Sequence, residues 1–268
     1  MSVFDEDTAV ERLDEESWAG RVTSRWNVGS VPNGGYVLSM AGRAFTQALA
    51  HPEPLTVNAF FLAKTEIGDA RLLVESMRTG NKISFGSARL IQGEQEKMRV
   101  TAAYTDLGAL EGPEYVESGP PDAPGPEHCI PADMLQVEFS KRFDIRYLPA
   151  YSGLLEGERM DRAEFVAWSR FRDGREPDAL SLLLFADAFP PALFSRFGVT
   201  GWVPTVELTV QVRRRPVPGY LLCRFRSRYL TDGLVEEDGE IWDSEFNLVA
   251  LSRQLAKFRI PETGRGGL

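Results

Sequence analysis

An internal repeat constrains the fold of this 268-residue chain more than any other feature of its sequence. When the chain is laid on itself with a shift of 149 positions, three segments match in the same order. They are Thr56-Val57 with Thr205-Val206, Arg71–Leu73 with Tyr220–Leu222, and Val100 with Val249. Ordered matches at one shift indicate an internal duplication, so we expect two copies of one structural unit.

Both copies contain segments in which apolar and polar residues alternate with period two, the pattern of strands with one buried face. The segments span residues 55–63, 70–78, 83–92 and 96–105 in the first half, and 203–213, 220–229, 234–243 and 248–258 in the second. A further strand is expected near residues 165–171. We therefore expect an antiparallel sheet in each copy, and two sheets joined edge to edge leave fewer strand edges open.

Each half also contains one apolar segment typical of a buried helix. Residues 34–49 are apolar on more than one face, and Asn33 is a suitable N-cap. Residues 177–189 are the counterpart; they begin with Pro177 at a first-turn position and are followed by Pro190. Because both segments are apolar nearly all round, we expect a sheet to wrap around each helix.

The region between the repeats differs in composition. Residues 108–134 are rich in proline, glycine and acidic residues and have almost no periodicity, which is typical of a surface linker. We therefore divide the chain into a first unit at 1–107, the linker at 108–134, a second unit at 135–260 and a tail at 261–268.

Composition excludes several classes of function. A formal net charge of -9 disfavours nonspecific binding to nucleic acid. No apolar run approaches the roughly 20 residues that span a bilayer, and the acidic N-terminus does not resemble a signal peptide, so we expect a cytoplasmic protein without membrane insertion. Cys129 and Cys223 form no CxxC pair, and His51 and His128 are the only histidines. We therefore expect no metal site and no cofactor.

A long apolar helix wrapped by an antiparallel sheet, present twice in one chain, resembles the double hotdog, an α+β fold. Four motifs resemble segments of acyl-CoA thioesterase II proteins and their thioesterase-like relatives. They are Asn33-Gly34-Gly35-Tyr36 at the start of the first helix, Trp202–Thr209 in a second-half strand, and Glu237–Asp243 and Val249–Gln254 in the last two strands. The resemblance covers nearly the whole chain apart from the linker and the tail. It implies hydrolysis of acyl-CoA thioesters, and we expect a homo-oligomer, a dimer or larger.

Thioester hydrolysis needs a nucleophilic water, a base that orients it, and hydrogen-bond donors facing the oxyanion. The sequence has no G-x-S-x-G motif and few histidines, so a carboxylate is the simplest base. Asp187 is the only acid in the apolar run 179–189, where an unpaired carboxylate is costly to bury. Solvation at the end of the helix, close to Pro190, is the structural alternative for Asp187.

The thioesterase II family is understood to use an Asp, a Thr or Ser, and a Gln from its second half. Matching the motifs places these roles at Asp187, Thr205 and Gln254. Thr209, four residues further along the same strand and therefore expected on the same face as Thr205, is the other candidate for the hydroxyl. The first half has no acid within residues 34–49, which implies one complete site per chain.

The resemblance also assigns substrate binding to Asn33, Gly34, Gly35 and Tyr36. The free backbone N–H groups at this helix start could polarise a thioester carbonyl, although close packing of the glycines against the sheet would explain them equally well. The cluster Arg213–Arg215 could bind the phosphates of coenzyme A or could be a solvated strand end.

Two other functions remain open on sequence grounds. A noncatalytic module that binds acyl groups or acyl-CoA could use the same fold with an idle Asp187. A hotdog hydratase or dehydratase usually needs a catalytic histidine, and neither His51 nor His128 lies in an expected helix or strand.

Overall fold

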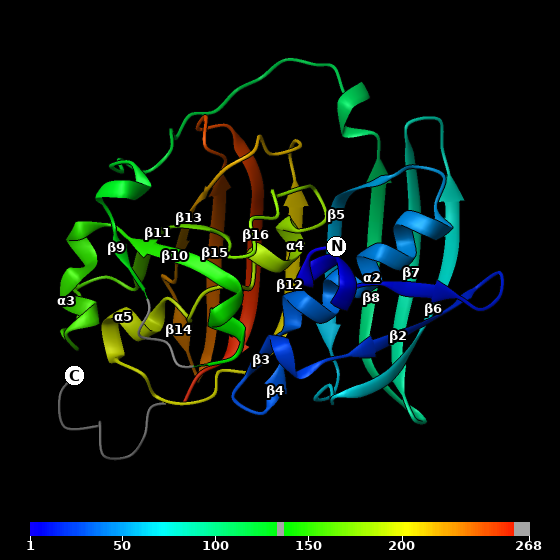
Figure 1. Cartoon of the computed structure of the whole chain (residues 1–268), viewed down its shortest axis with the longest axis horizontal. Coiled ribbons are helices and arrows are strands. Elements are labelled where there is room, and N and C mark those ends of the chain that lie inside the picture. The colour runs from blue at the N-terminus through cyan, green and yellow to red at the C-terminus, as the bar shows by residue number, and fades with distance from the viewer. Residues whose placement is uncertain (133–136, 260–268) are drawn as a thin grey trace.

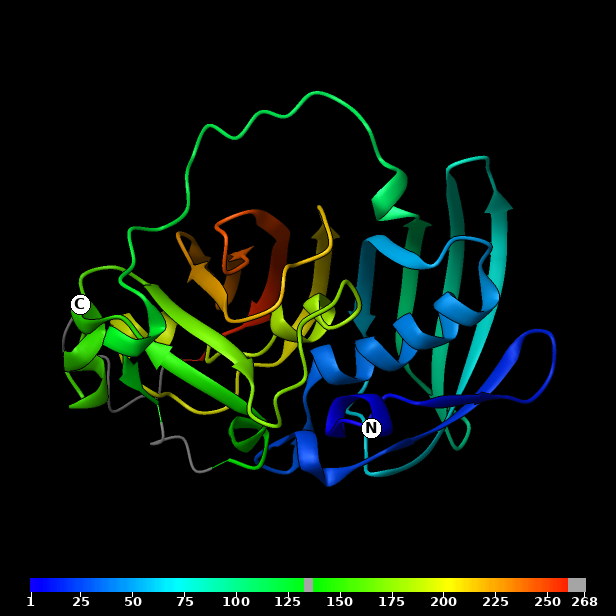
Figure 2. The same cartoon turned by 45° about the horizontal axis from the view of Figure 1, so that its top comes forward.

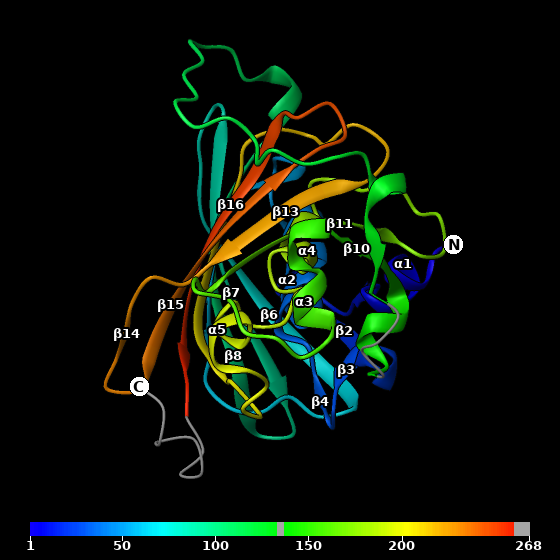
Figure 3. The same cartoon turned by 90° about the vertical axis from the view of Figure 1, so that its left-hand side faces the viewer.

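One antiparallel sheet runs along the molecule, and the helices α2 and α4 lie on its concave side (Figure 1, Figure 3). The structure is a computed structural model that describes residues 1–132 and 137–259. The expected tail at 261–268 and the end of the expected linker therefore lie outside the described residues. Within them, the order of the main strands is β1-β2-β6-β7-β8-β5-β12-β16-β15-β13-β11-β10-β9, and all neighbouring strands are antiparallel.

The strands of the first half are β1 Val10–Arg12, β2 Ser17–Val22, β5 Glu53–Phe61, β6 Gly68–Thr79, β7 Ile83–Gln92 and β8 Gln95–Thr105, with a separate hairpin of β3 Asn27–Val28 and β4 Val31–Pro32. Those of the second half are β9 Ile130–Pro131, β10 Phe143–Tyr147, β11 Glu164–Phe171, β12 Thr205–Val212, β13 Leu221–Arg226, β14 Leu230–Thr231, β15 Leu234–Trp242 and β16 Leu248–Lys257. The α-helices are α1 Val3–Asp7, α2 Gly34–Ala48, α3 Ser152–Leu155, α4 Leu182–Phe185 and α5 Leu193–Phe197. Short 3-10 turns are Ser24–Trp26, Leu107–Ala109, Pro126–His128, Phe139–Arg142 and Pro149–Tyr151.

The two halves of the sheet meet where β5 pairs with β12. On one side of this pair the order outward is β8, β7, β6, β2, and on the other side it is β16, β15, β13, β11. Strands related by the sequence shift therefore occupy equivalent places about the β5–β12 junction. The expected α+β double hotdog, with its two sheets joined edge to edge, is confirmed.

The expected first helix is present as α2, which lies against the sheet of the first half (Figure 2). Its N-cap is Asn33, whose Oδ1 accepts a hydrogen bond from the Tyr36 N–H at 2.9 Å. Most of its residues from Gly35 to Phe45 are buried, because β5 to β8 cover one face and α4 packs against another. The apolar surface seen all round this segment is explained by that double burial.

The expected second helix is much shorter than residues 177–189. Asp178 and Ser181 form a reciprocal cap in which each side chain accepts the other's backbone N–H, at 2.8 and 2.9 Å. Only Leu182–Phe185 is α-helical, and the chain then tightens into turns, with the Asp187 N–H donating to the Leu184 carbonyl. The prediction of a long helix was wrong because tertiary contacts of this segment with α2 override its local pattern.

An unexpected element, α1, packs between the two halves. The Phe4 ring is fully buried, and its centre lies 6.0 Å from the Trp26 ring and 5.3 Å from the Phe171 ring. Beside it, the Asp5 carboxylate accepts two hydrogen bonds from Arg175, at 3.0 and 3.1 Å. The N-terminal helix therefore holds residues of both repeats together.

After β8 the chain arches over to the second half (Figure 1). The far part of this segment is fixed by the Trp168 indole N–H, which donates to the Pro124 carbonyl at 2.8 Å. Among the residues that the structure describes, no helix is both long enough and apolar enough to cross a membrane.

Truncation of the α1 anchor should destabilise the whole chain. We expect Phe4→Ala to lower the free energy of unfolding by about 3–5 kcal/mol, the usual range for removing a buried aromatic side chain. Urea unfolding followed by tryptophan fluorescence measures this change. Tyr115→Ala, at an exposed position in the linker, is the control and should change stability by less than about 0.5 kcal/mol. Equal effects of the two substitutions would contradict the anchoring role.

Candidate functional site

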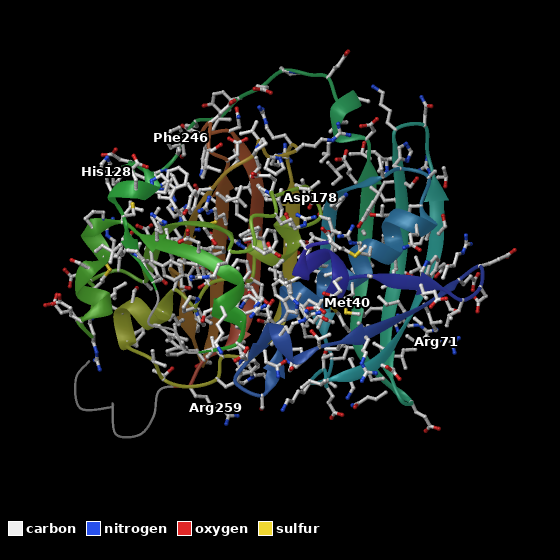
Figure 4. All side chains as sticks on the ribbon, viewed as in Figure 1. Met40, Arg71, His128, Asp178, Phe246 and Arg259 are labelled. Carbon is white, nitrogen blue, oxygen red and sulfur yellow. The ribbon has the colours of Figure 1, made fainter. Side chains whose placement is uncertain are left out.

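The first turn of α2 meets the turn that follows α4, and Asp187 is the residue that joins them. Its Oδ2 accepts hydrogen bonds from the Gly35 N–H at 2.8 Å and from the Asn33 Nδ2 at 2.9 Å. The Asn33 amide also donates to the Asp187 carbonyl at 2.7 Å. Figure 4 places Asp178, at the start of the segment that leads into α4, in the middle of the molecule, whereas His128 lies far out in the second half.

The close approach of these two turns requires glycine. A Cβ on Gly35 would lie 2.9 Å from the Asp187 Cβ and 2.9 Å from the Leu183 carbonyl oxygen. A Cβ on Gly34 would lie 3.0 Å from the Asp187 Oδ2. Both glycines therefore fit the packing explanation, and the same packing brings the positive end of α2 onto the carboxylate.

The environment of Asp187 changes its acidity. Burial raises the pKa of Asp187 to about 6, against the lowering effect of the Gly35 N–H, the Asn33 amide and the Gly34 N–H. Its Oδ1 accepts no hydrogen bond from any residue in the described ranges. Asp187 is thus a carboxyl that ionises near neutral pH with one oxygen free, as a general base requires.

Thr205 and Gln254 lie on neighbouring strands of the second half. Gln254 is directly opposite Leu208, and Thr205 is directly opposite Ala256. Leu208 and Ala256 are buried, so Gln254 and Thr205 lie on the inner face of the sheet, because directly opposite residues share a face. No hydrogen bond within the described residues joins Asp187, Thr205 and Gln254 directly.

A β-bulge decides which threonine lies on this face. The register shifts between Thr205 and Glu207, which turns Thr205 inward although strict alternation would place it with Thr209. The Thr209 hydroxyl donates to the Glu207 carboxylate at 2.6 Å and accepts from the Asn58 amide at 2.8 Å, on the opposite face of the sheet. The expectation that both threonines share a face was wrong because a bulge inserts one extra residue.

The other motif residues have different positions. The Tyr36 side chain is fully buried and stacks on Trp26, with its hydroxyl donating to the Asp7 carbonyl at 3.1 Å. It therefore belongs to the core, and only its backbone lies at the helix start. Arg214 forms an ion pair with Glu114, and Arg215 forms ion pairs with Glu53 and Asp106. Arg213 has no such pair among the described residues. These pairings are the arrangement of a solvated strand end.

The inner face of the sheet carries a further carboxyl that the sequence did not single out as functional. Glu237 lies on β15 directly opposite Gln254, and its Oε2 accepts a hydrogen bond from the Ala192 N–H. The pKa of Glu237 is raised to about 8, mainly by burial and in part by the negative charge of Asp187, against the lowering effect of the hydrogen bond from Ala192. The motif Glu237–Asp243 contains this residue, but the sequence does not indicate that its side chain faces inward, because Glu237 stands between two other acids in a strand.

No three His, Cys, Asp or Glu side chains within 1–132 and 137–259 are grouped so that they could hold a metal ion.

Comparison with known protein families gives a match for each half of the chain. The acyl-CoA thioesterase N-terminal domain family matches residues 22–105, and the acyl-CoA thioesterase C-terminal domain family matches residues 114–258. An uncharacterised protein of Mycobacterium tuberculosis is 27% identical over 88% of this chain and 89% of its own length. A thioesterase-like protein of Talaromyces wortmannii is 21% identical, over 99% of this chain and 94% of its own length.

Solved structures give the same result for the fold. A Thermobifida fusca protein described as a candidate thioesterase II superposes with a TM-score of 0.89 and 28% identity, over 96% of this chain and 97% of that one. An acyl-CoA thioesterase II of Mycobacterium marinum superposes with a TM-score of 0.79 at 19% identity, over 97% of this chain and 100% of that one.

The glycine contact predicts a sensitive position. We expect Gly35→Ala to destabilise the chain by about 1–3 kcal/mol, because its methyl group would overlap with Asp187 and with the backbone of α4. Thermal unfolding measures the change. Gly112→Ala in the linker, where an added methyl meets nothing, is the matched control and should leave the melting temperature unchanged. A Gly35→Ala variant as stable as this control would show that α2 and α4 are not held this closely.

The raised pKa of Asp187 predicts an effect on stability. Since its folded pKa of about 6 lies above the ordinary 3.8, ionised Asp187 opposes folding, and this cost grows as pH rises through 6. Asp187→Asn should therefore stabilise the chain at pH 7, by about 1–3 kcal/mol. The gain should be smaller at pH 5, because most Asp187 carboxyls are then protonated in the folded chain and carry no charge that opposes folding. Urea unfolding at both pH values checks this, and a destabilised variant at pH 7 would contradict it.

Proposed function

This chain belongs to the acyl-CoA thioesterase family and is a thioester hydrolase, and we propose that it cleaves acyl-CoA at the start of α2 with Asp187 as the general base. The observation that carries the proposal is the Asp187 carboxylate, fixed through Oδ2 by Gly35 and Asn33 and free at Oδ1 among the described residues. A carboxylate held in this way can orient a water molecule without moving itself.

The reaction follows from ordinary acyl-transfer chemistry. Asp187 accepts a proton from the water as its oxygen attacks the thioester carbonyl carbon. The carbonyl oxygen becomes an oxyanion, and the bond from carbon to sulfur then breaks as the carbonyl re-forms. The thiolate of coenzyme A leaves and takes up the proton, so that the products are the free acid and the thiol. Asp187 is returned to its ionised state.

Thr205 and Gln254 supply hydrogen bonds in this scheme. Support comes from the inner face of β12 and β16, where the bulge turns the Thr205 side chain to the same side as Gln254. A hydroxyl and an amide can each donate to the attacking water or to the oxyanion. Asn33, Gly34 and Gly35 act through the helix start, where they hold the carboxylate beside the bound thioester, whereas the buried Tyr36 side chain has no direct role.

The base assignment predicts a loss of turnover. Asp187→Asn should lower kcat by about a hundredfold or more, the scale expected for a general base, with a much smaller change in KM. Release of thiol from short, medium, long and aryl acyl-CoAs measures this. Asp178→Asn keeps the N-cap of the neighbouring turn and is the matched control, with kcat expected within about twofold of wild type. In the wild type, kcat should fall as pH drops below about 6, because Asp187 becomes protonated.

Thr205→Ala and Gln254→Ala should each lower kcat less than Asp187→Asn does. The double variant should lose less than the product of the single losses if both side chains hold one water molecule. An active enzyme indifferent to Asp187→Asn would mean that another group is the base. A wild-type protein that binds acyl-CoA but releases no thiol would support the binding module instead.

A further inference from the structure

Glu237 and Gln254 are the polar members of an otherwise apolar row across the inner face of the sheet. The row runs from Glu237 on β15 through Gln254 on β16 to a set of buried apolar residues on the next strands, which are Leu208, Ala59, Val100, Ala88 and Val74. An acid in such a row is costly unless it is paired or neutral. The position of Glu237 therefore calls for an explanation that the packing of the sheet does not provide.

The surroundings of Glu237 favour a neutral side chain. Its Oε2 accepts a hydrogen bond from the Ala192 N–H, and no Lys or Arg in the described ranges forms an ion pair with it. The charges that act on it most strongly are all negative. They come from Asp187 in the turn after α4 and from Glu236 and Asp238, its neighbours on β15. On β16 it faces the uncharged amide of Gln254.

Ala192, whose N–H donates to Glu237, follows shortly after Asp187 in the chain, so this segment brings the two carboxyls into one partly buried place, where no Lys or Arg of the described residues pairs with either. Two such groups do not both ionise easily, because each charge raises the pKa of the other. The two partners are not equivalent. Asp187 receives two hydrogen bonds at Oδ2 from the start of α2, which favour its ionised form, whereas Glu237 receives one at Oε2.

We propose that Glu237 is a positioning residue of this site, which keeps the proton of the Asp187–Glu237 pair so that Asp187 is the carboxylate that activates water. This inference rests on the proposed function, since it concerns the same site. The pKa values have the order that it requires, about 6 for Asp187 and about 8 for Glu237. Above pH 8 a second negative charge would lie beside the developing oxyanion and would slow the reaction.

The pH dependence of kcat tests the proposal in the wild type and in Glu237→Gln. After subtraction of uncatalysed hydrolysis, wild-type kcat should rise near pH 6 and fall above pH 8, approaching tenfold per pH unit. Glu237→Gln should keep the rise and lose the fall, which gives the variant an advantage of about tenfold or more at pH 9.5. Gln retains an oxygen for the Ala192 N–H and nearly the same volume, so a purely structural role would leave the alkaline fall in place.

Glu236→Gln is the matched control, because Glu236 lies on the same strand, directly opposite the outward-facing Leu255, and Gln can still accept from the Arg228 N–H. This variant should retain the alkaline fall, moved to somewhat lower pH because one negative charge beside Glu237 is removed. The proposal is overturned if Glu237→Gln shows the same alkaline fall as the wild type and this control.

A measurement without turnover separates this inference from the proposed function. With carboxyl-labelled glutamate, NMR of the wild type should show one resonance that titrates near pH 8 and is missing in Glu237→Gln. In Asp187→Asn this resonance should titrate at lower pH, because the neighbouring charge is gone. Titration of Glu237 near its ordinary pKa would overturn the inference even in an active enzyme. A wild type without thioesterase activity would refute only the proposed function.

Discussion

The carboxylate of Asp187 lies on the first turn of α2, and the arrangement of the site depends on this contact. The carboxylate belongs to the second repeat and its donors, Asn33 and Gly35, belong to the first, so the bond exists only when the two halves are assembled. It also explains why the helix start carries two glycines, since a side chain at Gly35 would collide with the α4 turn. The hydrogen bonds to Asp187 and the close packing of the two turns therefore depend on the same residues of α2.

Duplication of the unit is accompanied by a division of roles. The continuous sheet across β5 and β12 fixes the two helices relative to each other, but the halves contribute different groups. The first half gives the start of a long capped helix, and the second half gives both carboxyls, Asp187 and Glu237. Because residues 34–49 contain no acid, the equivalent place in the first half has no counterpart of Asp187.

The two carboxyls of the site also lower the stability of the folded chain. Asp187 and Glu237 both have raised pKa values, and neither forms an ion pair with a cation in the part of the chain that the structure describes, an arrangement that opposes folding at neutral pH. Elsewhere the chain is held by apolar packing, such as Phe4 between Trp26 and Phe171, which offsets this cost. Perturbed carboxyls of this kind are typical of sites where proton transfer is needed rather than of stabilising ion pairs.

The sequence alone determined the repeat, nine of the strands and the first helix, because alternation with period two and the Asn33 cap are local signals, whereas β1, β2, β9 and β10 of the same sheet were found only in the structure. It also singled out Asp187 as a lone acid among apolar residues. The short α4, the inward turn of Thr205 and the partial burial of Glu237 were decided by the tertiary structure. Each of them depends on a contact between segments distant in sequence: α4 on α2, Thr205 on a bulge opposite β16, and Glu237 on the Asp187 turn and Ala192. Local patterns carry no information about such contacts, because a residue's burial and register depend on which strands and turns become its neighbours.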